Sequence, residues 1–515
     1  MVKLKEYAII DIGSNTVRLV IYQVTPLGNI SQLQNVKLPV RLYQYLDEQG
    51  NLAEIGIEKL IEVIQLFQTI LAEYAPMELI ATATAVIRQA HNQKEVLKQV
   101  RKQTNVTLRL LSDQEEAYYG QYAIARTTQF AEGYTVDMGG GSTEVTYFKD
   151  NEIQEYHSFP FGVVTLKNLF FTNKEPGDKK AIKKAQSYIY NQLNQLEWLK
   201  ARQLPIIAVG GSARNIASVH QIISNYPLSG IHEYEMTKQH LQEVCELFQE
   251  LSLEELQNLD GLSKDRADII LPANLTFLAL CTQVNASAFV FCNKGLREGL
   301  LLEQLNQQVP NLYDPQRVVE GMLTRMTETY NINVEIAEKR MNVAKQLLSS
   351  CQEAGLVERN DTLNRYVYFA SYLYHMGSYI EEDDSSMHSF YLIANSNLNG
   401  FSHKERVILA LLASYKNKSL TRKFLQNMPT LFTSQELEMI RKAGCLIKFT
   451  ESLLVTRVNK IVSMALVKDN KKEYSLRICW TNEPLAESYR ANRQKKNFET
   501  VIKKSIQLDF MKQLN

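Results

Sequence analysis

The chain has 515 residues, of which 45% are hydrophobic and 22% are charged, and this composition predicts an ordinary soluble globular protein with several domains. No apolar run is long enough to span a membrane, and the first twenty residues lack the uninterrupted apolar core of a signal peptide. Six cysteines without C-x-x-C spacing argue against a zinc site or a disulfide framework, and they predict a cytoplasmic protein with buried free thiols.

The net charge of +1 is unevenly distributed along the chain. Residues 401–515 hold 22 Lys and Arg against 10 Asp and Glu, whereas the first 400 residues hold 35 against 46. A basic C-terminal part suggests attraction of a polyanion, with a solvated basic surface as the simpler alternative. Nucleic acid is the rival polyanion, and we rank it lower because no nucleic-acid-binding motif is recognisable.

The first pattern, over residues 7–22, is an apolar β-branched run, an Asp-x-Gly-hydroxyl turn and a second apolar run, and it predicts a β-hairpin. Asp11 ends the first strand, and Ser14 and Asn15 lie in the turn. Residues 58–74 then place apolar side chains at helical spacing, which predicts an amphipathic helix that contributes to the core.

A hydroxyl and a guanidinium follow the next predicted strand, at residues 77–84. Arg88 comes four residues after Thr84, near the start of a predicted helix. At this spacing the two side chains can face one phosphate, and Arg can bind its oxygens in a bidentate manner. A surface arginine is the commoner alternative.

A capping box is predicted after the strand of residues 107–111. Ser112 and Glu115 have the S-x-x-E spacing that starts a helix and gives Glu115 a structural role. Glu116 points about 100° away around the helix, which leaves its carboxylate free for chemistry. The alternative is that both acids only favour the helix N-terminus.

The central pattern, over residues 135–146, is again a strand, a glycine turn and a strand. Successive glycines let the backbone approach an anion and direct several N–H groups toward it. Asp137 and Glu144 can hold a divalent cation or position water beside a phosphate, and Ser142 adds a hydroxyl. A plain glycine-rich hairpin is the alternative, and recurrence of the pattern near the N-terminus weighs against it. The turn contains Gly139, Gly140 and Gly141.

A third glycine turn follows the apolar run of residues 206–209. Gly210, Gly211 and Ser212 form this turn, and a helix that begins there would favour anions at its N-terminus. Further on, residues 294–303 predict a helix that returns to the first lobe.

Together these motifs resemble the exopolyphosphatase and guanosine pentaphosphate phosphohydrolase family, within the actin, heat-shock-chaperone and sugar-kinase superfamily. The resemblance spans residues 1 to about 425. It implies an α/β fold with two ribonuclease-H-like (actin-type) lobes, an α-helical HD-like domain and a small C-terminal α+β domain. The runs that carry it are Asp11 to Asn15, Thr84 to Ala90, Ser112 to Ala117, Asp137 to Glu144 and Asn293 to Gly299.

The predicted domains follow from this resemblance and from prolines near residue 310. The first lobe comprises residues 1–126 and is completed by about 296–309, the second lobe comprises 127–295, the helical domain 310–425 and the basic terminal domain 426–515. In the helical domain Met376 stands where the HD metal motif needs Asp, so we expect no intact metal site and a core or hydrogen-bonded role for His375 and His388. Residues 447–455, 460–467 and 473–479 have strand character.

The resemblance implies a hydrolase that removes the terminal phosphate of a polyphosphorylated chain with Mg²⁺ or another divalent cation. In the family, a Glu at the position matching Glu116 is the base that activates water. The expected metal ligands are Asp11, Asp137 and Glu144. The expected phosphate ligands are Ser14, Asn15, Thr84, Arg88, Gly139, Gly140, Gly141, Ser142, Gly210, Gly211 and Ser212.

Inorganic polyphosphate is the expected substrate, because the additional C-terminal residues and their basic charge suggest a track for a long polyanion. Guanosine pentaphosphate is the alternative within the family. More remote alternatives are a sugar-kinase-like or chaperone-like ATPase and a non-catalytic polyphosphate or alarmone sensor. No membrane partner is expected, and the assembly is left open, with a homodimer as one alternative.

Overall fold

The computed structural model describes residues 4–75, 77–228, 230–426, 428, 431–456, 460–469 and 473–512. The chain forms two compact units. The first comprises Met1–Asn225, Ile231–Arg325 and Asn399–Ser402, and the second comprises Tyr226–Gly230, Met326–Leu398 and His403–Asn515. The first unit therefore continues beyond residue 310, and the division into four domains stays a prediction.

The first sheet of the N-terminal unit has the strand order β3-β2-β1-β4-β5. Strands β1 to β3 are antiparallel neighbours, whereas β4 runs parallel to β1 and β5 runs parallel to β4. The predicted first hairpin is confirmed by the pairing of β1 with β2. The strands are β1 (Lys5–Ile12), β2 (Val17–Val24), β3 (Ile30–Leu38), β4 (Glu78–Ala83) and β5 (Arg109–Leu110).

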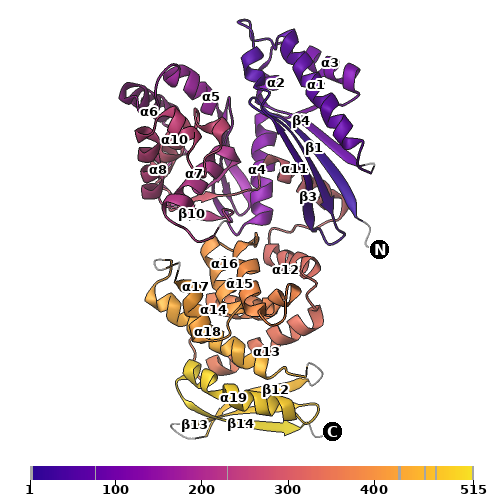
Figure 1. The fold of residues 1–515 in the computed structure, drawn as a ribbon, viewed down its shortest axis with the longest axis vertical. Coiled ribbons are helices and arrows are strands. Elements are labelled where there is room, and N and C mark those ends of the chain that lie inside the picture. The colour runs from indigo at the N-terminus through magenta and orange to yellow at the C-terminus, as the bar shows by residue number, and fades with distance from the viewer. Residues whose placement is uncertain are drawn as a thin grey trace. The chain divides into compact units, whose positions relative to one another are not determined.

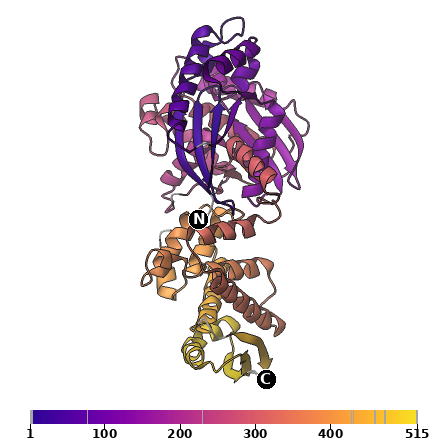
Figure 2. The same ribbon diagram turned by 90° about the vertical axis from the view of Figure 1, so that its right-hand side faces the viewer.

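Both faces of this sheet are buried at its central strands, because alternate residues of β1 point to opposite sides and both sets are apolar, whereas the edge strand β3 is largely exposed. Ala8 and Ile10 belong to one core, whereas Tyr7 and Ile9 belong to another core that includes leucines of α11 (Leu296–Gln308). The predicted return of this late helix to the first lobe is thus confirmed. Both ribbon views show the segment near residue 300 beside the N-terminal strands (Figure 1, Figure 2).

The second sheet has the order β10-β11-β9-β6-β7-β8. Its centre is the predicted glycine hairpin, which the antiparallel pairing of β6 with β7 confirms. Strand β9 runs parallel to β6 on the other side. The strands are β6 (Glu132–Met138), β7 (Thr143–Lys149), β8 (Glu152–Phe159), β9 (Ile206–Val209), β10 (Tyr234–Met236) and β11 (Phe289–Phe291).

Helices cover these two sheets (Figure 1). The predicted helix of residues 58–74 corresponds to α1, which begins and ends a few residues earlier than the apolar spacing suggested. The remaining elements up to residue 329 are η1 (Leu42–Tyr45), α1 (Glu54–Leu71), α2 (Ala85–Gln89), α3 (Gln93–Thr104), α4 (Asp113–Thr127), α5 (Val163–Leu166), η2 (Lys167–Phe171), α6 (Lys179–Leu193), α7 (Gly210–Ile223), α8 (Lys238–Glu250), α9 (Leu253–Gln257), η3 (Lys264–Arg266), α10 (Ile270–Gln283) and α12 (Val318–Thr329).

The C-terminal unit packs helices against a three-stranded sheet of order β12-β13-β14. Phe449 of α18 stacks on Phe498 of α19 with ring centroids 4.7 Å apart. The elements are α13 (Val334–Glu353), α14 (Asp361–Leu373), η4 (Met376–Tyr379), α15 (Ser385–Asn395), α16 (His403–Ala413), α17 (Lys418–Leu425), α18 (Ser434–Ser452), β12 (Ile461–Lys468), β13 (Glu473–Trp480), α19 (Leu485–Ile502) and β14 (Ser505–Lys512).

Two of the three strands predicted in this unit are confirmed, and the one at residues 447–455 is wrong. Residues 434–452 form a helix instead, because Thr433 and Glu436 make a capping box and Ile440, Ala443 and Ile447 bury one helical face. The apolar run that resembled a strand is the buried end of this helix.

The altered HD-like motif has a structural role in this unit. His375 Nε2 lies 2.8 Å from Glu451 Oε1, as expected for a hydrogen-bonded histidine, and Met376 is buried. Glu451 also accepts a hydrogen bond of 2.6 Å from Arg340 Nε.

Among the described helices, none combines the length and apolarity required to cross a bilayer. All six cysteines are free, and Cys479 is the one that is partly exposed.

Candidate active site

Two β-hairpins, one from each sheet, place their turns against each other. Asp11 and Arg18 are direct neighbours across the β1–β2 hairpin, and Asp137 and Glu144 are direct neighbours across the β6–β7 hairpin. A Cβ on Gly140 would lie 3.5 Å from the Cβ of Ser14, so the two turns lie close together, with room for little more than one carbon atom between them. Tertiary folding therefore joins two motifs that are separated by more than a hundred residues.

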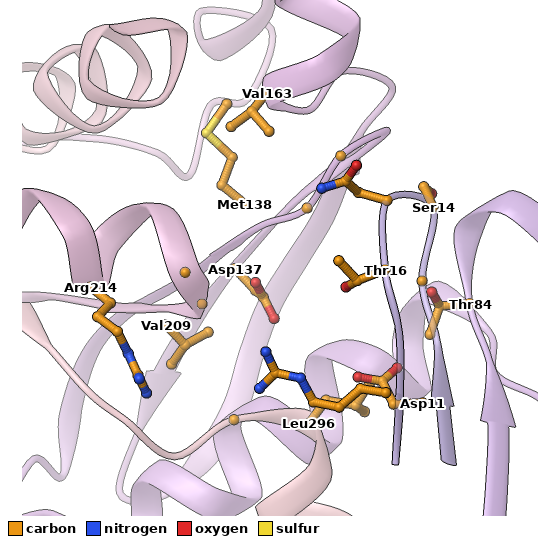
Figure 3. A pocket seen from close by; sticks show the side chains of 18 of the residues that line it. Asp11, Ser14, Thr16, Thr84, Asp137, Met138, Val163, Val209, Arg214 and Leu296 are labelled. Atoms are coloured by element: carbon orange, nitrogen blue, oxygen red, sulfur yellow. The ribbon is translucent and has the colours of Figure 1, made fainter. Parts of the chain in front are cut away.

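A cleft of about 440 Å³ opens between these hairpins, and we call it the main cleft. Figure 3 shows Asp11 and Asp137 directed into this pocket from the two hairpins, with Ser14, Thr16 and Thr84 along one wall. Arg88 and Ser212 do not line it. The predicted site residues that line it are Asp11, Ser14, Asn15, Thr84, Glu116, Asp137, Gly139, Gly140, Gly141, Ser142, Glu144, Gly210 and Gly211.

The glycine turn is held from behind by the segment that leads into α5. The N–H groups of Val163 and Val164 donate to the carbonyl oxygens of Gly139 and Gly140, each at 3.0 Å. A Cβ on Gly162 would lie 2.4 Å from the Gly139 oxygen, so this approach requires glycine at position 162. Because these carbonyl groups accept hydrogen bonds from the α5 segment, the glycine turn is held in place at the edge of the cleft.

Helix α7 begins directly at Gly210, so the predicted third turn is itself the helix N-terminus. Gly210 has φ of 88°, a conformation that glycine adopts without strain. Ser212 is buried and its Oγ accepts a hydrogen bond of 3.1 Å from Arg266 Nη1. A Cβ on Gly211 would lie 2.2 Å from Arg266 Nη2, so this glycine makes room for the guanidinium.

The predicted capping box at the start of α4 is confirmed. Ser112 Oγ accepts from the Glu115 amide at 3.2 Å, and Glu115 Oε2 accepts from the Ser112 amide at 2.8 Å. Glu116, the next residue, lines the main cleft and forms an ion pair with Arg88. Arg88 also pairs with Asp113 and donates to the Leu111 carbonyl at 2.8 Å. The structure thus places Arg88 where it orients Glu116, and direct contact between Arg88 and phosphate stays a prediction.

Five carboxylates line this cleft, namely Asp11, Glu116, Asp137, Glu144 and Glu298, and loss of solvent together with mutual repulsion raises the pKa of several of them. Burial and the charge of Asp11 raise the pKa of Asp137 to about 6. Burial and the charge of Asp137 raise the pKa of Glu144 to about 7. Burial and the charge of Glu144 raise the pKa of Glu116 to about 8, against the opposing effect of Arg88. These carboxylates would be stabilised in their ionised form by a cation bound among them.

Cationic side chains supply the other half of the site, and sequence reasoning did not assign them to phosphate. Burial and the nearby charge of Arg297 lower the pKa of Arg18 to about 10, with further contributions from Arg214 and Arg266. Cations that repel one another inside a cleft favour an anion with several charges. The basic residues that line the cleft are Arg18, Lys37, Arg214, Lys294, Arg266 and Arg297.

Three of these four arginines had a signal in the sequence, since Arg214 closely follows the glycine turn at Gly210, and Arg266 had none. Hairpin register puts Arg18 beside Asp11, and Arg297 lies in a run that resembles the family. Arg266 belongs to the short segment η3, whose position against Ser212 is set by the tertiary fold.

A divalent cation that is bound by protein carboxylates and by phosphate oxygens together fits the chemistry of this cleft. Within the described residues, no three His, Cys, Asp or Glu side chains come together as a complete metal site. Mg²⁺ commonly binds one or two carboxylates and takes its other ligands from phosphate and water. Asp137 and Glu144 match this requirement, whereas Asp11 already has Arg297 at 3.8 Å.

The fold is that of the actin-like superfamily, with a cleft between two hairpins that is lined by both cationic and acidic side chains. Residues 20–308 match the sequence model of the Ppx/GppA phosphatase family, and residues 318–484 match that of Ppx/GppA phosphatase domain III. The chain belongs to the Ppx/GppA phosphatase family, and it is an enzyme that hydrolyses phosphoric anhydrides.

Similar proteins support the same family. The chain is 28% identical over 306 residues to exopolyphosphatase 1 of Mycobacterium tuberculosis, a match that covers 58% of this chain and 88% of that protein. A solved Aquifex aeolicus member of the Ppx/GppA family is 27% identical, with a TM-score of 0.53 and coverage of 60% of this chain and 99% of that one. A solved exopolyphosphatase from Cytophaga hutchinsonii, 21% identical over 59% of this chain and 98% of that one, shares the fold with a TM-score of 0.54.

Proposed function

We propose that this enzyme is an exopolyphosphatase that releases the terminal phosphate of inorganic polyphosphate. The observation that carries the proposal is a cleft in which several cations, from strands of the first sheet and from helices and loops around both sheets, face a cluster of largely buried carboxylates. The cations bind consecutive phosphates of the polyphosphate chain. The carboxylates act at its terminal phosphate, where the reaction takes place. Positioning and charge neutralisation supply most of the rate gain in phosphoryl transfer.

In the proposed reaction, Glu116 accepts a proton from the attacking water. The water oxygen forms a bond to the terminal phosphorus, and the bridging P–O bond breaks with its electron pair on the shortened chain. Arg88 fixes the Glu116 carboxylate at the edge of the cleft, which is the position a general base requires. Orthophosphate and a chain shorter by one phosphate are the products.

The amide groups of the glycine turns and the hydroxyls beside them are the proposed phosphate ligands. The N–H groups of Gly140 and Gly141 have no acceptor among the described residues, which leaves them available to phosphate oxygens. A divalent cation held by Asp137 and Glu144, with Asp11 nearby, would neutralise charge on the bound phosphates.

Polyphosphate is preferred over guanosine pentaphosphate because the main cleft offers little to a purine base. Phe291 is the aromatic side chain among the residues that line it, and this side chain is only 1% exposed. A flat base would therefore find no exposed aromatic ring on which to stack, whereas a chain of phosphates needs none. A cytoplasmic location, predicted from cysteine usage, belongs to the same proposal.

The test is orthophosphate release from long-chain polyphosphate and from guanosine pentaphosphate, each with and without Mg²⁺. We expect Mg²⁺-dependent release with a higher kcat/KM for polyphosphate. Glu116→Gln, which removes the proposed base at nearly constant shape, is the control for contaminating phosphatases. A higher kcat/KM for guanosine pentaphosphate would overturn the proposed substrate, and phosphate transfer from ATP to an acceptor would overturn hydrolysis.

A further inference from the structure

A small second cavity adjoins the carboxylates on the side of helix α4. It has a volume of about 20 Å³, and it shares Glu116, Asp137 and Glu144 with the main cleft. Its remaining polar lining consists of Thr135 and Thr146. A polar cavity of this size accommodates one water molecule, and it is far too small for phosphate.

The cavity results from the pattern of β6 and β7. Thr135 and Thr146 are direct neighbours across the hairpin, two residues from the Asp137–Glu144 pair. Because side chains alternate along a strand, both pairs occupy the same face of the sheet, and α4 packs against that face. The two hydroxyls and the two carboxylates therefore form two successive cross-strand pairs on the sheet face beneath α4.

Gly120 of α4 has no side chain, and this leaves the space of the second cavity opposite the two cross-strand pairs. It lies one helical turn after Glu116, on the same side of α4, and it lines the second cavity. A Cβ on Gly120 would meet no heavy atom within 4 Å. Glycine in the middle of a helix is less stabilising than alanine, so Gly120 keeps this space open at a cost in helix stability.

The two threonine hydroxyls suit a bound water. Thr135 is 6% exposed and Thr146 is 1% exposed, and both side chains line the cavity. A buried water needs two to four polar partners. The hydroxyls and the adjacent carboxylate of Glu116 provide them.

We propose that the second cavity binds a water molecule between Thr135, Thr146 and Glu116, and that it supplies water to the reacting carboxylate from the α4 side. This inference rests on the proposed hydrolase function. A phosphate chain that fills the main cleft displaces solvent there, whereas the second cavity stays open to water because it is too small for phosphate. Gly120 is accordingly a positioning residue, since its missing side chain keeps the water site open.

Gly120→Ala tests this proposal by placing a methyl group in the cavity. The substitution should raise the melting temperature of the protein, because alanine favours a helix and the new Cβ meets no atom within 4 Å. In the same variant, kcat for polyphosphate should fall by roughly 10–100-fold as the water is displaced, with KM nearly unchanged. A purely structural role of Gly120 predicts the same gain in stability but an unchanged kcat.

Thr146→Val removes one hydroxyl at nearly constant shape and should also lower kcat. Thr127→Val is the matched control, because Thr127 lies on α4 and its hydroxyl donates to the Ala123 carbonyl at 2.6 Å, outside the cavity. This control should keep the wild-type kcat. If Gly120→Ala fails to fold, Thr146→Val decides the matter by itself.

The outcomes separate the water site from the proposed function. Wild-type kcat in Gly120→Ala, or in Thr146→Val, overturns the water site while the hydrolase proposal stands. An inactive wild-type enzyme overturns the hydrolase proposal and this inference together. A crystal structure should also show an ordered water within hydrogen-bonding distance of Thr146 and Glu116, and an empty cavity would contradict the inference.

Discussion

Replacement of Glu116 by Gln tests both the proposed base and the electrostatics of the cleft. The change keeps the shape of the side chain and removes its capacity to accept a proton from water. A general base contributes ~10²–10⁴-fold, so we expect kcat to fall by that factor while KM for polyphosphate changes little. Orthophosphate release under saturating substrate measures the effect. Turnover near that of the wild type would refute the role of Glu116.

The same substitution makes an independent prediction for stability in the absence of Mg²⁺ and phosphate. In the folded protein, burial and Glu144 raise the pKa of Glu116 to about 8, from an ordinary value of 4.5. The folded state therefore binds this proton more tightly than the unfolded state, and stability is lost as pH rises from 4.5 through 8. A shift of this size corresponds to several kcal/mol, at ~1.4 kcal/mol for each pKa unit.

Glu116→Gln lacks this titration, so its free energy of unfolding relative to the wild type should rise between pH 5 and 8. The ion pair with Arg88 forms only with ionised Glu116, and its effect is already contained in this pKa, so its loss does not reverse the slope. Urea unfolding at several pH values, without divalent cations, measures the difference. A difference that does not change with pH would refute the raised pKa, whatever the result for turnover.

Three further predictions follow from the cleft. Gly211→Ala should displace the guanidinium of Arg266 and weaken polyphosphate binding by roughly tenfold, which isothermal titration measures; unchanged affinity would show that this arginine is not a ligand. Arg88→Met removes the charge that lowers the pKa of Glu116, so the acidic limb of the kcat/KM profile should move to higher pH, and an unmoved limb would contradict the pairing. Truncation after residue 325, where the main segment of the first unit ends, should reduce activity on long chains more than on short ones, and equal losses would argue against a basic track.

Local sequence patterns were sufficient for the elements that carry the site. The hairpins around Asp11 and Asp137 were predictable because alternation of apolar residues and a glycine turn are short-range signals. The capping box of Ser112 and Glu115 was predictable for the same reason, since its partners are three residues apart. The failed strand at residues 447–455 shows the limit, because a short apolar run does not distinguish a strand from a buried helix end.

The sequence by itself determined which residue types stand at each turn and hence the family to which the chain belongs. Only the tertiary structure decided that Arg88 binds Glu116, that Arg266 enters the cleft and that Gly120 faces a void. The physical reason is that these relations depend on burial and on distances between segments far apart in the chain. Raised carboxylate pKa values and mutually repelling arginines arise when folding removes such groups from water and brings them together.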